Sequence, residues 1–219
     1  MTQSLPRISA YGDHALQIQY MTNGFSALIN NAVHALAAQL KPDENWVDIM
    51  TGYDSLVVTF DSAALDIDSA KRKIEDTLIR APQSKAAENI GRLIDIPVNY
   101  GGEHGPDMGA ICELSGLQEK AVIEVHAALE YRVCMMGFIP GFAFLSEAPA
   151  ILYHPRHASP RARVPAGSIG IANWQTGIYG LESPGGWQII GRTDLTLFDK
   201  TRKAPFLLDA GDRVRFIPQ

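Results

Sequence analysis

The fold is decided by residues 154–193, which read HPRHASPRARVPAGSIGIANWQTGIYGLESPGGWQIIGRT. Glycine and proline recur throughout this stretch. The wider region 131–192 holds nine of the 19 glycines and six of the 13 prolines in the chain. This density is typical of tight turns between short strands, so the region predicts a small β-barrel or β-sandwich.

The first eighty residues show a different pattern, in which strands and helices are mixed. Apolar and polar residues alternate over 8–20 around a Gly12-Asp13 turn, which predicts a hairpin. A 3/4 spacing of apolar residues over 25–40, preceded by Asn23, predicts a helix with an Asn cap. Further elements follow: strands over 47–51 and 55–60, and a helix from Asp66 and Asp68 through Leu78.

Residues 81–91 lose the apolar periodicity and read as a linker, so the chain is divided into an N-terminal α+β domain (1–84) and a second domain (91–219). The second domain begins with a strand over 93–98 and a glycine-rich loop over 100–107. A short helix is predicted over 108–114. Ser115 and Gln118 form a capping-box pattern for a second helix through Leu129, and the last strand covers 213–217.

Charge and targeting signals limit the class of protein. The 219 residues carry a net charge of −5, which argues against general nucleic-acid binding. Neither a secretory signal nor an apolar run of membrane-spanning length occurs in the sequence. The two cysteines, Cys112 and Cys134, are read as reduced core residues. We therefore expect a cytoplasmic enzyme or enzyme subunit that uses neither nucleic acid nor a membrane.

The strongest chemical signal is a cluster of arginines in a chain that is acidic overall. The sequence lacks the phosphate-loop, dinucleotide, zinc-protease and serine-hydrolase motifs. Between 131 and 192, five arginines face only two glutamates, and lysine is absent. Guanidinium forks suit carboxylates, carbamates and phosphates, so an anionic small molecule is the expected ligand. The alternative is that these arginines hydrogen-bond loop carbonyls. The five are Arg132, Arg156, Arg161, Arg163 and Arg192.

Several polar and aromatic residues lie around this cluster. Extended geometry between the prolines would put Arg161 and Arg163 on one face, where both could meet one ligand. Gln175, Thr176 and Tyr179 offer an amide, a hydroxyl and a phenol, although edge-strand polarity explains them equally well. Trp187 and Arg192 follow on a glycine-rich loop, and the GFIPGF segment at 137–142 is either a ligand-binding loop or a tight turn.

Among the histidines, His126 lies one helical turn from Val122 and is read as a hydrogen-bonded core or interface residue and not as a general base. His104 is the better acid/base candidate because it lies in the glycine-rich loop. Glu103 and Asp107 in the same loop also suggest a Mg²⁺ site, although spacing is a weak guide for that ion.

Ordered blocks over nearly the whole chain resemble the family of the bacterial 5-oxoprolinase B subunit, also called allophanate hydrolase subunit 1 or KipI-like proteins. The blocks beyond residues 154–193 are YGDHALQIQY (11–20), VDIMTGYDSLVVTF (47–60), YGGEHGPDM (100–108), VIEVHAALEYRV (122–133), GFIPGFAFL (137–145) and LLDAGDRVRF (207–216). The resemblance implies a small α+β N-terminal domain and a cyclophilin-like β-barrel domain. Two departures, Asn173-Trp174 and Gly180, lie where the family usually has glycine and proline.

The resemblance also implies a reaction, the ATP-driven opening of 5-oxo-L-proline to L-glutamate. ATP would be the co-substrate, with Mg²⁺. This chain would act with the C subunit of 5-oxoprolinase, which is similar to allophanate hydrolase subunit 2, to phosphorylate the lactam, and the A subunit would hydrolyse the product. The implied catalytic residues are His104 and Arg163, and no metal ligands are assigned. The implied binding residues are Arg161, Gln175, Thr176, Tyr179, Trp187 and Arg192.

Two other functions are open at this point. Related chains are named as inhibitors of a sensor histidine kinase, in which case the barrel would present a protein-binding face. The same paired domains also occur in urea carboxylase and allophanate-type enzymes, where they act on carboxybiotin.

Overall fold

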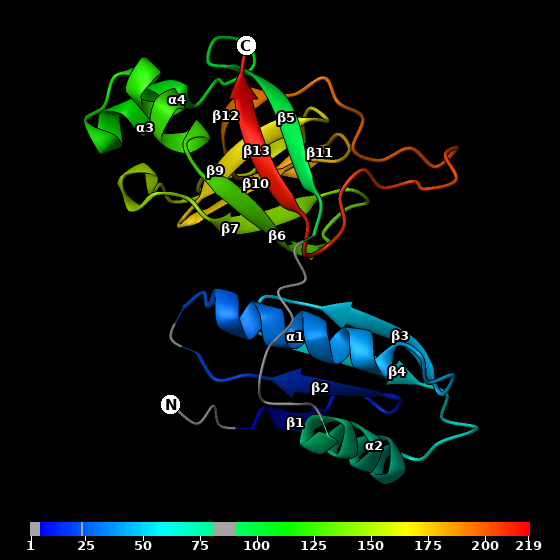
Figure 1. The fold of residues 1–219 in the computed structure, drawn as a ribbon. Coiled ribbons are helices and arrows are strands. Elements are labelled where there is room, and N and C mark those ends of the chain that lie inside the picture. Colours follow the sequence, from blue (N-terminus) through cyan, green and yellow to red (C-terminus); the bar gives the residue numbers. More distant parts are fainter. Residues whose placement is uncertain (1–4, 23, 81–90) are drawn as a thin grey trace. The chain divides into compact units, whose positions relative to one another are not determined.

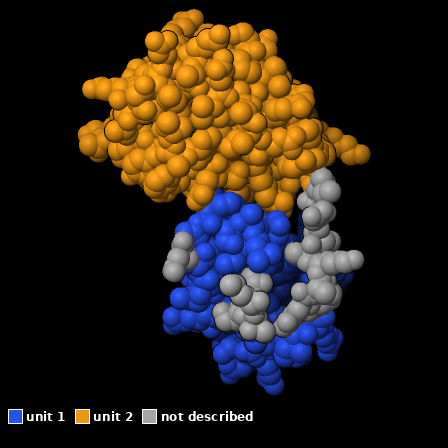
Figure 2. Space-filling view, turned by 60° about the vertical axis from the view of Figure 1, so that its left-hand side comes forward, with its two compact units in different colours: residues 1–89 blue, residues 90–219 orange. Residues whose placement is uncertain are grey.

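The computed structural model describes residues 5–22, 24–80 and 91–219. The chain divides into two compact units, Met1–Asn89 and Ile90–Gln219 (Figure 2). The predicted linker, residues 81–91, lies outside the described residues except for Gly91, so the predicted domain limits of 1–84 and 91–219 stay predictions. None of the described helices is long and apolar enough to cross a membrane.

The N-terminal unit is a four-stranded antiparallel sheet packed against two helices (Figure 1). The strand order is β1-β2-β4-β3. Alternate residues of β4, such as Leu56 and Val58, are buried and pack against Val33 of α1 and Ile74 of α2. Its elements are β1 (Arg7–Ala10), β2 (Ala15–Gln19), α1 (Ala27–Leu40), β3 (Trp46–Thr51), β4 (Ser55–Phe60) and α2 (Ile67–Arg80).

The predicted hairpin, helices and strands of this unit are confirmed, but the predicted cap of the first helix is wrong. Helix α1 begins at Ala27, and the Ser26 hydroxyl accepts a hydrogen bond from the Ile29 N–H at 3.3 Å. Asn23, the predicted cap, lies outside the described residues. The predicted start of α2 is confirmed, because Asp66 accepts from the Ser69 N–H at 2.8 Å.

The C-terminal unit is a closed barrel of seven strands in the order β10-β7-β6-β13-β5-β12-β9 (Figure 1). This confirms the predicted α+β fold with a barrel domain. Strands β8 and β11 form a separate two-stranded sheet. The elements are β5 (Leu93–Tyr100), α3 (Met108–Ser115), α4 (Glu119–Ala127), β6 (Glu130–Met136), β7 (Ala143–Glu147), the 3₁₀ helix η1 (Ala150–Leu152), β8 (Arg161–Val164), β9 (Ser168–Ala172), β10 (Gln175–Ile178), β11 (Ser183–Gly185), β12 (Gln188–Arg192) and β13 (Arg213–Pro218).

The first and last strands of the barrel unit, β5 and β13, lie side by side and parallel. Ile96 and Phe216 are register partners and both point into the barrel, where they are buried. Asp95 and Arg215 are also partners and point outward, where Arg215 donates two hydrogen bonds of 2.9 and 2.8 Å to the carboxylate. The alternation follows from the period of two residues along a strand.

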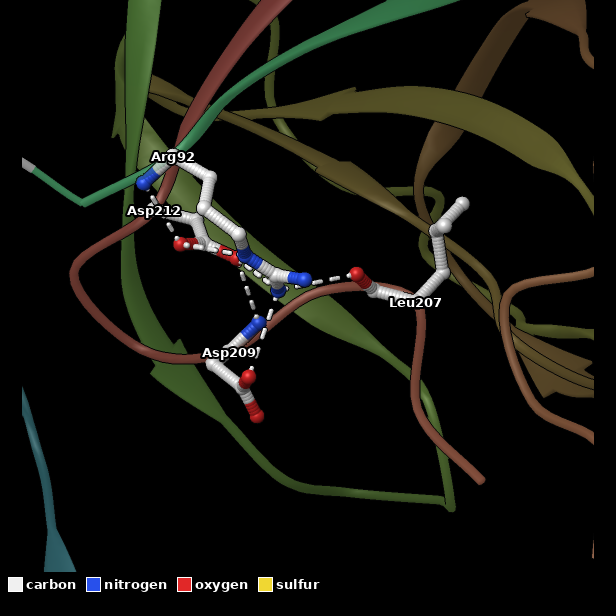
Figure 3. A network of polar contacts seen from close by, with 4 residues as sticks. All are labelled: Arg92, Leu207, Asp209 and Asp212. Carbon is white, nitrogen blue, oxygen red and sulfur yellow. Dashed lines mark hydrogen bonds and ion pairs between the residues drawn. The ribbon is translucent and has the colours of Figure 1, made fainter. Parts of the chain in front are cut away.

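A network of polar contacts lies where the chain enters the barrel unit, just before strand β5 (Figure 3). The buried Asp212 carboxylate accepts from the backbone N–H of Arg92 at 3.0 Å and from its guanidinium at 2.5 Å. It also accepts from the Asp209 N–H at 3.0 Å, and Arg92 donates to the Leu207 carbonyl at 3.1 Å. The network therefore ties the start of β5 to the turn before β13.

The predicted capping box at residues 115–118 is wrong. Ser115 is the last residue of α3, and its hydroxyl donates to the Ile111 carbonyl at 2.6 Å. Gly116 then adopts a left-handed conformation with φ of 71°, which ends α3. Helix α4 begins at Glu119, and Gln118 makes no side-chain capping hydrogen bond. The Ser115 hydroxyl is thus used by its own helix.

Candidate functional site

A cavity of about 230 Å³ brings together four of the predicted site residues, His104, Arg161, Arg163 and Arg192. They come from the loop after β5, from β8 and from the end of β12. The cavity is therefore formed by segments that are far apart in the sequence. Its other lining residues are Glu103, Pro106, Val164, Pro165, Ser168 and Ile189.

The glycine-rich loop that carries His104 is held against strand β12. The Gly101 N–H donates to the Ile190 carbonyl at 3.0 Å, and the Asp107 N–H donates to the Ile189 carbonyl at 2.9 Å. A Cβ atom at Gly105 would lie 2.2 Å from the Ile190 carbonyl oxygen, so only glycine fits between loop and strand. The glycines of this loop thus bring His104 to the wall of the cavity.

Arg161 is fixed by a buried carboxylate that the sequence did not indicate as its partner. The Arg161 guanidinium donates two hydrogen bonds to Asp107, of 2.8 and 2.5 Å. Asp107 is only 6% exposed, and its Oδ2 also accepts from the Ile189 N–H at 2.6 Å. Such a bidentate ion pair fixes both the position and the plane of the guanidinium. Arg161 therefore presents a fixed edge to the cavity.

His157 completes this group. Its Nε2 lies 2.8 Å from an Arg161 guanidinium nitrogen and 3.3 Å from Asp107 Oδ1. Because a guanidinium can only donate, Nε2 accepts and the ring proton is assigned to Nδ1. The sequence offered no partner for His157.

Arg163 lies at the rim of the cavity, with its side chain 77% exposed. It donates to both oxygens of Glu182, at 3.0 and 2.9 Å. This hydrogen bonding holds the pKa of Glu182 below its usual value and raises the pKa of Arg163. An exposed pair of this kind is weak and exchanges readily with solvent or ligand.

Arg192 differs from these two arginines in its charge balance. Within the described part of the chain, no carboxylate forms an ion pair with Arg192. The charges of Arg161 and Arg163 are offset by Asp107 and Glu182, whereas Glu103, the carboxylate that also lines the cavity, has a side chain 87% exposed and forms no ion pair with Arg192. Arg192 therefore carries the guanidinium that is free to bind an anion.

His104 carries the second unsatisfied group in the cavity. Its Nδ1 atom is buried and has no hydrogen-bond partner among the described residues. Its Nε2 lies 3.6 Å from a carboxylate oxygen of Glu103, whose side chain is 87% exposed. Buried polar atoms are nearly always paired, so this nitrogen leaves unused hydrogen-bonding capacity on a residue that lines the same cavity as Arg192.

The other four predicted site residues do not line this cavity. Gln175 is half-buried at the start of β10. Tyr179 and Trp187 are buried in an aromatic cluster around Phe142, with ring centroids 4.8 and 5.5 Å from the Phe142 ring. Burial raises the pKa of Tyr179. This cluster packs behind the cavity, since it also includes Val164 and Ile189.

Thr176, the fourth of them, lies inside the barrel and bonds to His126. The Thr176 hydroxyl donates to the Gly170 carbonyl at 3.1 Å, so its oxygen accepts from His126 Nε2 at 3.0 Å. His126 Nδ1 then accepts from the Tyr100 hydroxyl at 2.8 Å. Burial lowers the pKa of His126 to about 3. The core role predicted for His126 is confirmed.

The predicted grouping of Glu103, His104 and Asp107 around Mg²⁺ does not form. Asp107 is occupied by Arg161, and the described residues contain no group of three or more His, Cys, Asp or Glu side chains that could hold a metal ion.

Comparison with known proteins places this chain in a family. Residues 6–208 match the family described as "Carboxyltransferase domain, subdomain C and D". The chain is 46% identical over 188 residues to the 5-oxoprolinase B subunit of Escherichia coli O157:H7, covering 84% of this chain and 83% of that protein. It is 37% identical over 223 residues to the 5-oxoprolinase B subunit of Bacillus subtilis (strain 168), covering 96% and 92%. The chain belongs to the 5-oxoprolinase B-subunit family.

Comparison with solved structures shows that the fold of this chain occurs in another protein. The crystal structure of TTHA0988 superimposes with a TM-score of 0.81 at 36% identity, over 94% of this chain. This chain spans only 40% of the TTHA0988 chain, so that protein carries a further region.

Sequence reasoning named Asp107 as part of a suggested Mg²⁺ site and missed its role as the partner of Arg161. It also missed His157, Ser168 and Glu182 as parts of the site. Asp107 stands 54 residues from Arg161, and no local pattern links them. A signal did exist for Glu182, because it is one of only two carboxylates between 131 and 192. In a region with five arginines, each such carboxylate is a candidate partner.

Proposed function

We propose that this chain is a subunit of an ATP-dependent 5-oxoprolinase and that its cavity binds 5-oxo-L-proline. The observation that carries the proposal is the meeting of His104, Arg161, Arg163 and Arg192 in one cavity of a chain whose net charge is −5. The substrate is a small anion, and a volume of about 230 Å³ is below the roughly 300–1,000 Å³ of sites for drug-sized ligands.

The charges suggest how the substrate would be oriented. Arg192 has no carboxylate partner in the described chain, so it can pair with the substrate carboxylate or with a phosphate. Arg161 cannot move freely, because Asp107 holds two of its nitrogens. The remaining edge of Arg161 and the His104 imidazole then face the lactam. Arranged in this way, fixed donors stabilise negative charge that develops on the reacting group.

The proposed chemistry activates an amide that is otherwise a poor substrate for water. The lactam oxygen attacks the γ-phosphorus of ATP, the bond from that phosphorus to the β,γ-bridging oxygen breaks, and ADP leaves. Water then adds to the activated carbon, and the C–N bond opens to give the acyl phosphate of glutamate. A second water hydrolyses this acyl phosphate to L-glutamate and phosphate. In this scheme the arginines neutralise phosphate charge, as phosphoryl transfer requires. The hydrolytic part is assigned to the A subunit of the enzyme, and the phosphorylation to this chain together with the C subunit.

Mg²⁺ would accompany the nucleotide. The described residues provide no cluster of metal ligands, so we expect the ion to be held mainly by the phosphates of ATP and by water. No residue of this chain is assigned to the metal.

The test is reconstitution of the chain with the A and C subunits and measurement of ATP-dependent glutamate release from 5-oxoproline. We expect Arg192→Ala to lower kcat/KM for 5-oxoproline by at least about a hundredfold, because a charge-assisted pair contributes about 3 kcal/mol. Arg215→Ala is the matched control, since Arg215 lies on the outer face of β13 and pairs with Asp95. That variant should keep wild-type kinetics.

Two results would count against the proposal. A folded complex of all three subunits that shows no turnover would remove the 5-oxoprolinase assignment. Turnover that is equally insensitive to Arg192→Ala and Arg215→Ala would keep the assignment but remove the cavity from the site.

A second candidate function comes from the description of the matching family as a carboxyltransferase domain. Carboxyl transfer to a small amide would also place an anionic carbamate near Arg192. Carboxylation of urea by the chain together with a biotin carboxylase, in place of glutamate release, would favour this candidate.

A further inference from the structure

A second cavity lies beside the first and shares a wall with it. Its volume is about 380 Å³. Arg192 belongs to the lining of both cavities. Two chain segments, residues 164–168 and 189–196, contribute lining residues to both cavities. The residues that line only the second cavity are Ala166, Gly180, Leu181, Thr193, Asp194, Leu195, Thr196 and Phe198.

The wall between the two cavities is tightly built. Gly167 lies between Ala166 of the second cavity and Ser168 of the first. It has φ of +80°, and a Cβ atom there would lie 2.1 Å from the Thr193 carbonyl oxygen. The Thr193 N–H donates to the Gly167 carbonyl at 3.0 Å. The segments are thus bonded directly to each other, and Arg192 extends from this junction.

The second cavity differs in chemistry from the first. The first is lined by three arginines, a histidine and the exposed Glu103, whereas Arg192 is the only cation in the lining of the second. Leu181, Leu195 and the Phe198 ring give the second cavity apolar walls. Asp194 adds one exposed carboxylate. This pattern suits an elongated molecule with a flat apolar part, hydroxyl groups and an anionic end.

Resting on the proposed function, we propose that the second cavity binds the base and ribose of ATP, with its phosphates directed along Arg192 toward the first cavity. The adenine would lie between Leu195 and Phe198, because aromatic and apolar surfaces stack on a base. The Asp194 carboxylate would accept hydrogen bonds from the ribose hydroxyls, as acidic residues do in dinucleotide sites. The larger cavity thus takes the non-reacting body of the nucleotide.

This arrangement puts Arg192 where the reaction needs positive charge. The γ-phosphate has to meet the lactam oxygen at the boundary between the two cavities. A guanidinium at that boundary contacts the transferred group from the side and stabilises its charge in the transition state. It also explains why Arg192 has no carboxylate partner in the described chain, unlike Arg161 and Arg163.

The test uses the complete complex with the A and C subunits and a substitution that fills the second cavity. Ala166→Trp places a ring in the cavity at an exposed turn position, and Ala162→Trp is the control because Ala162 is exposed on β8 and lines neither cavity. We expect Ala166→Trp to raise KM for ATP at least tenfold and to change KM for 5-oxoproline less than twofold. Ala162→Trp should change neither constant.

A second substitution and a photolabelling experiment test the same cavity independently of Ala166→Trp. Asp194→Ala should raise KM for ATP about threefold, equivalent to the loss of one hydrogen bond of roughly 0.7 kcal/mol. Photolabelling of the complex with 8-azidoadenosine triphosphate should modify residues within 193–198. An unchanged KM for ATP in a folded Ala166→Trp complex, or label found solely on other segments or on the other two proteins of the complex, overturns this inference. A complex that is labelled at 193–198 but releases no glutamate instead overturns the proposed function.

Discussion

Two histidines of the barrel unit show opposite ways of placing a polar ring in a protein. His126 is completely buried, and both of its ring nitrogens are hydrogen-bonded, to Tyr100 and Thr176. His104 lies at the cavity wall, and its buried Nδ1 has no partner in the described chain. A satisfied polar group stabilises the fold, whereas an unsatisfied one has bonding capacity left for a ligand.

This comparison is tested most strongly by removing each ring in turn. His126→Ala leaves a cavity beside Phe216, whose ring centroid lies 4.8 Å from that of His126, and removes the hydrogen-bond partner of the Tyr100 hydroxyl. We expect the free energy of unfolding of the barrel unit to fall by about 4 kcal/mol. His104→Ala should lower it by less than about 1 kcal/mol but abolish most turnover.

The measurement is a urea titration monitored by amide hydrogen exchange in strands β9 and β12, which reports on the barrel unit alone. Equal losses of stability in the two variants would remove the distinction between the two histidines.

The next largest effect on stability is expected for the pair of Arg161 and Asp107. Arg161 lines the cavity, and its guanidinium is hydrogen-bonded to the buried Asp107 carboxylate. Asp107→Asn keeps the shape of the side chain but removes its charge and replaces one of the two oxygens that accept from Arg161 by an NH₂ group, while the other oxygen can still accept from the Ile189 N–H. We expect a loss of about 2 kcal/mol in the free energy of unfolding, typical of a hydrogen bond to a charged group. A raised KM for 5-oxoproline should accompany it, because Arg161 loses its fixed plane.

Asp95→Asn is the matched control for Asp107→Asn. Asp95 pairs with Arg215 in the same two-pronged geometry, but the pair is exposed on the outside of the barrel. Its removal should have a much smaller effect on stability. If the two variants were equally stable, burial of Asp107 would not be what holds Arg161.

The fold was largely predictable from the sequence because its signals are local. The strands over 47–51 and 55–60 were predicted to within one residue of β3 and β4, since turn residues and alternation mark both ends. The caps of α1 and α4 were predicted wrongly for different reasons. At α1 a nearer residue, Ser26, makes the capping hydrogen bond, and at α4 the expected cap, Ser115, ends the preceding helix and bonds to the Ile111 carbonyl.

The site was predictable only in part, for two physical reasons. Its decisive contact joins Asp107 to Arg161, and long-range pairing leaves no trace in the local sequence. Thr176 was assigned to a pocket because it is polar, yet β9 and β10 are buried on both faces. The alternation of polar and apolar residues along these strands therefore cannot show which side chains point into the barrel and which face a ligand site. Only the position of His126 explains why a hydroxyl points inward.

The pH dependence of stability tests whether the buried His126 ring is neutral in the folded protein. Because burial lowers the pKa of His126 to about 3, the folded state binds no proton there between pH 6.5 and 3, while the unfolded state does. Stability therefore falls as the pH is lowered through this range, by about 1.4 kcal/mol per pH unit.

The contribution of His126 is isolated by comparison with His126→Gln. The buried ring is then absent, and the difference in the free energy of unfolding between the two proteins should shrink from pH 6.5 downward. Carboxylates such as Asp43, whose pKa is lowered to about 2 by Lys73, affect both proteins equally. A difference that stays constant from pH 7 to pH 4 would mean that the pKa of His126 is the same in the folded and unfolded states, which contradicts its lowering by burial.

The smallest effect on stability is expected at the rim of the cavity, where Arg163 and Glu182 pair in solvent. Neither Arg163→Ala nor Glu182→Ala should shift the unfolding midpoint measurably, because exposed ion pairs contribute little. Their effects on substrate binding should nevertheless have opposite signs. Loss of Arg163 removes a positive charge from the cavity and raises KM for 5-oxoproline, whereas loss of Glu182 frees Arg163 for the anion and lowers KM.

Each change in KM should be about twofold at low salt and should fade as ionic strength rises, because exposed charges are screened. The measurement is the KM for 5-oxoproline of the reconstituted complex at two salt concentrations. Changes of the same sign in both variants would show that Arg163 and Glu182 act only as a structural pair. Opposite signs would show that Arg163, like Arg192, contributes its charge to binding of the ligand, although Arg163 is paired with Glu182 in the structure.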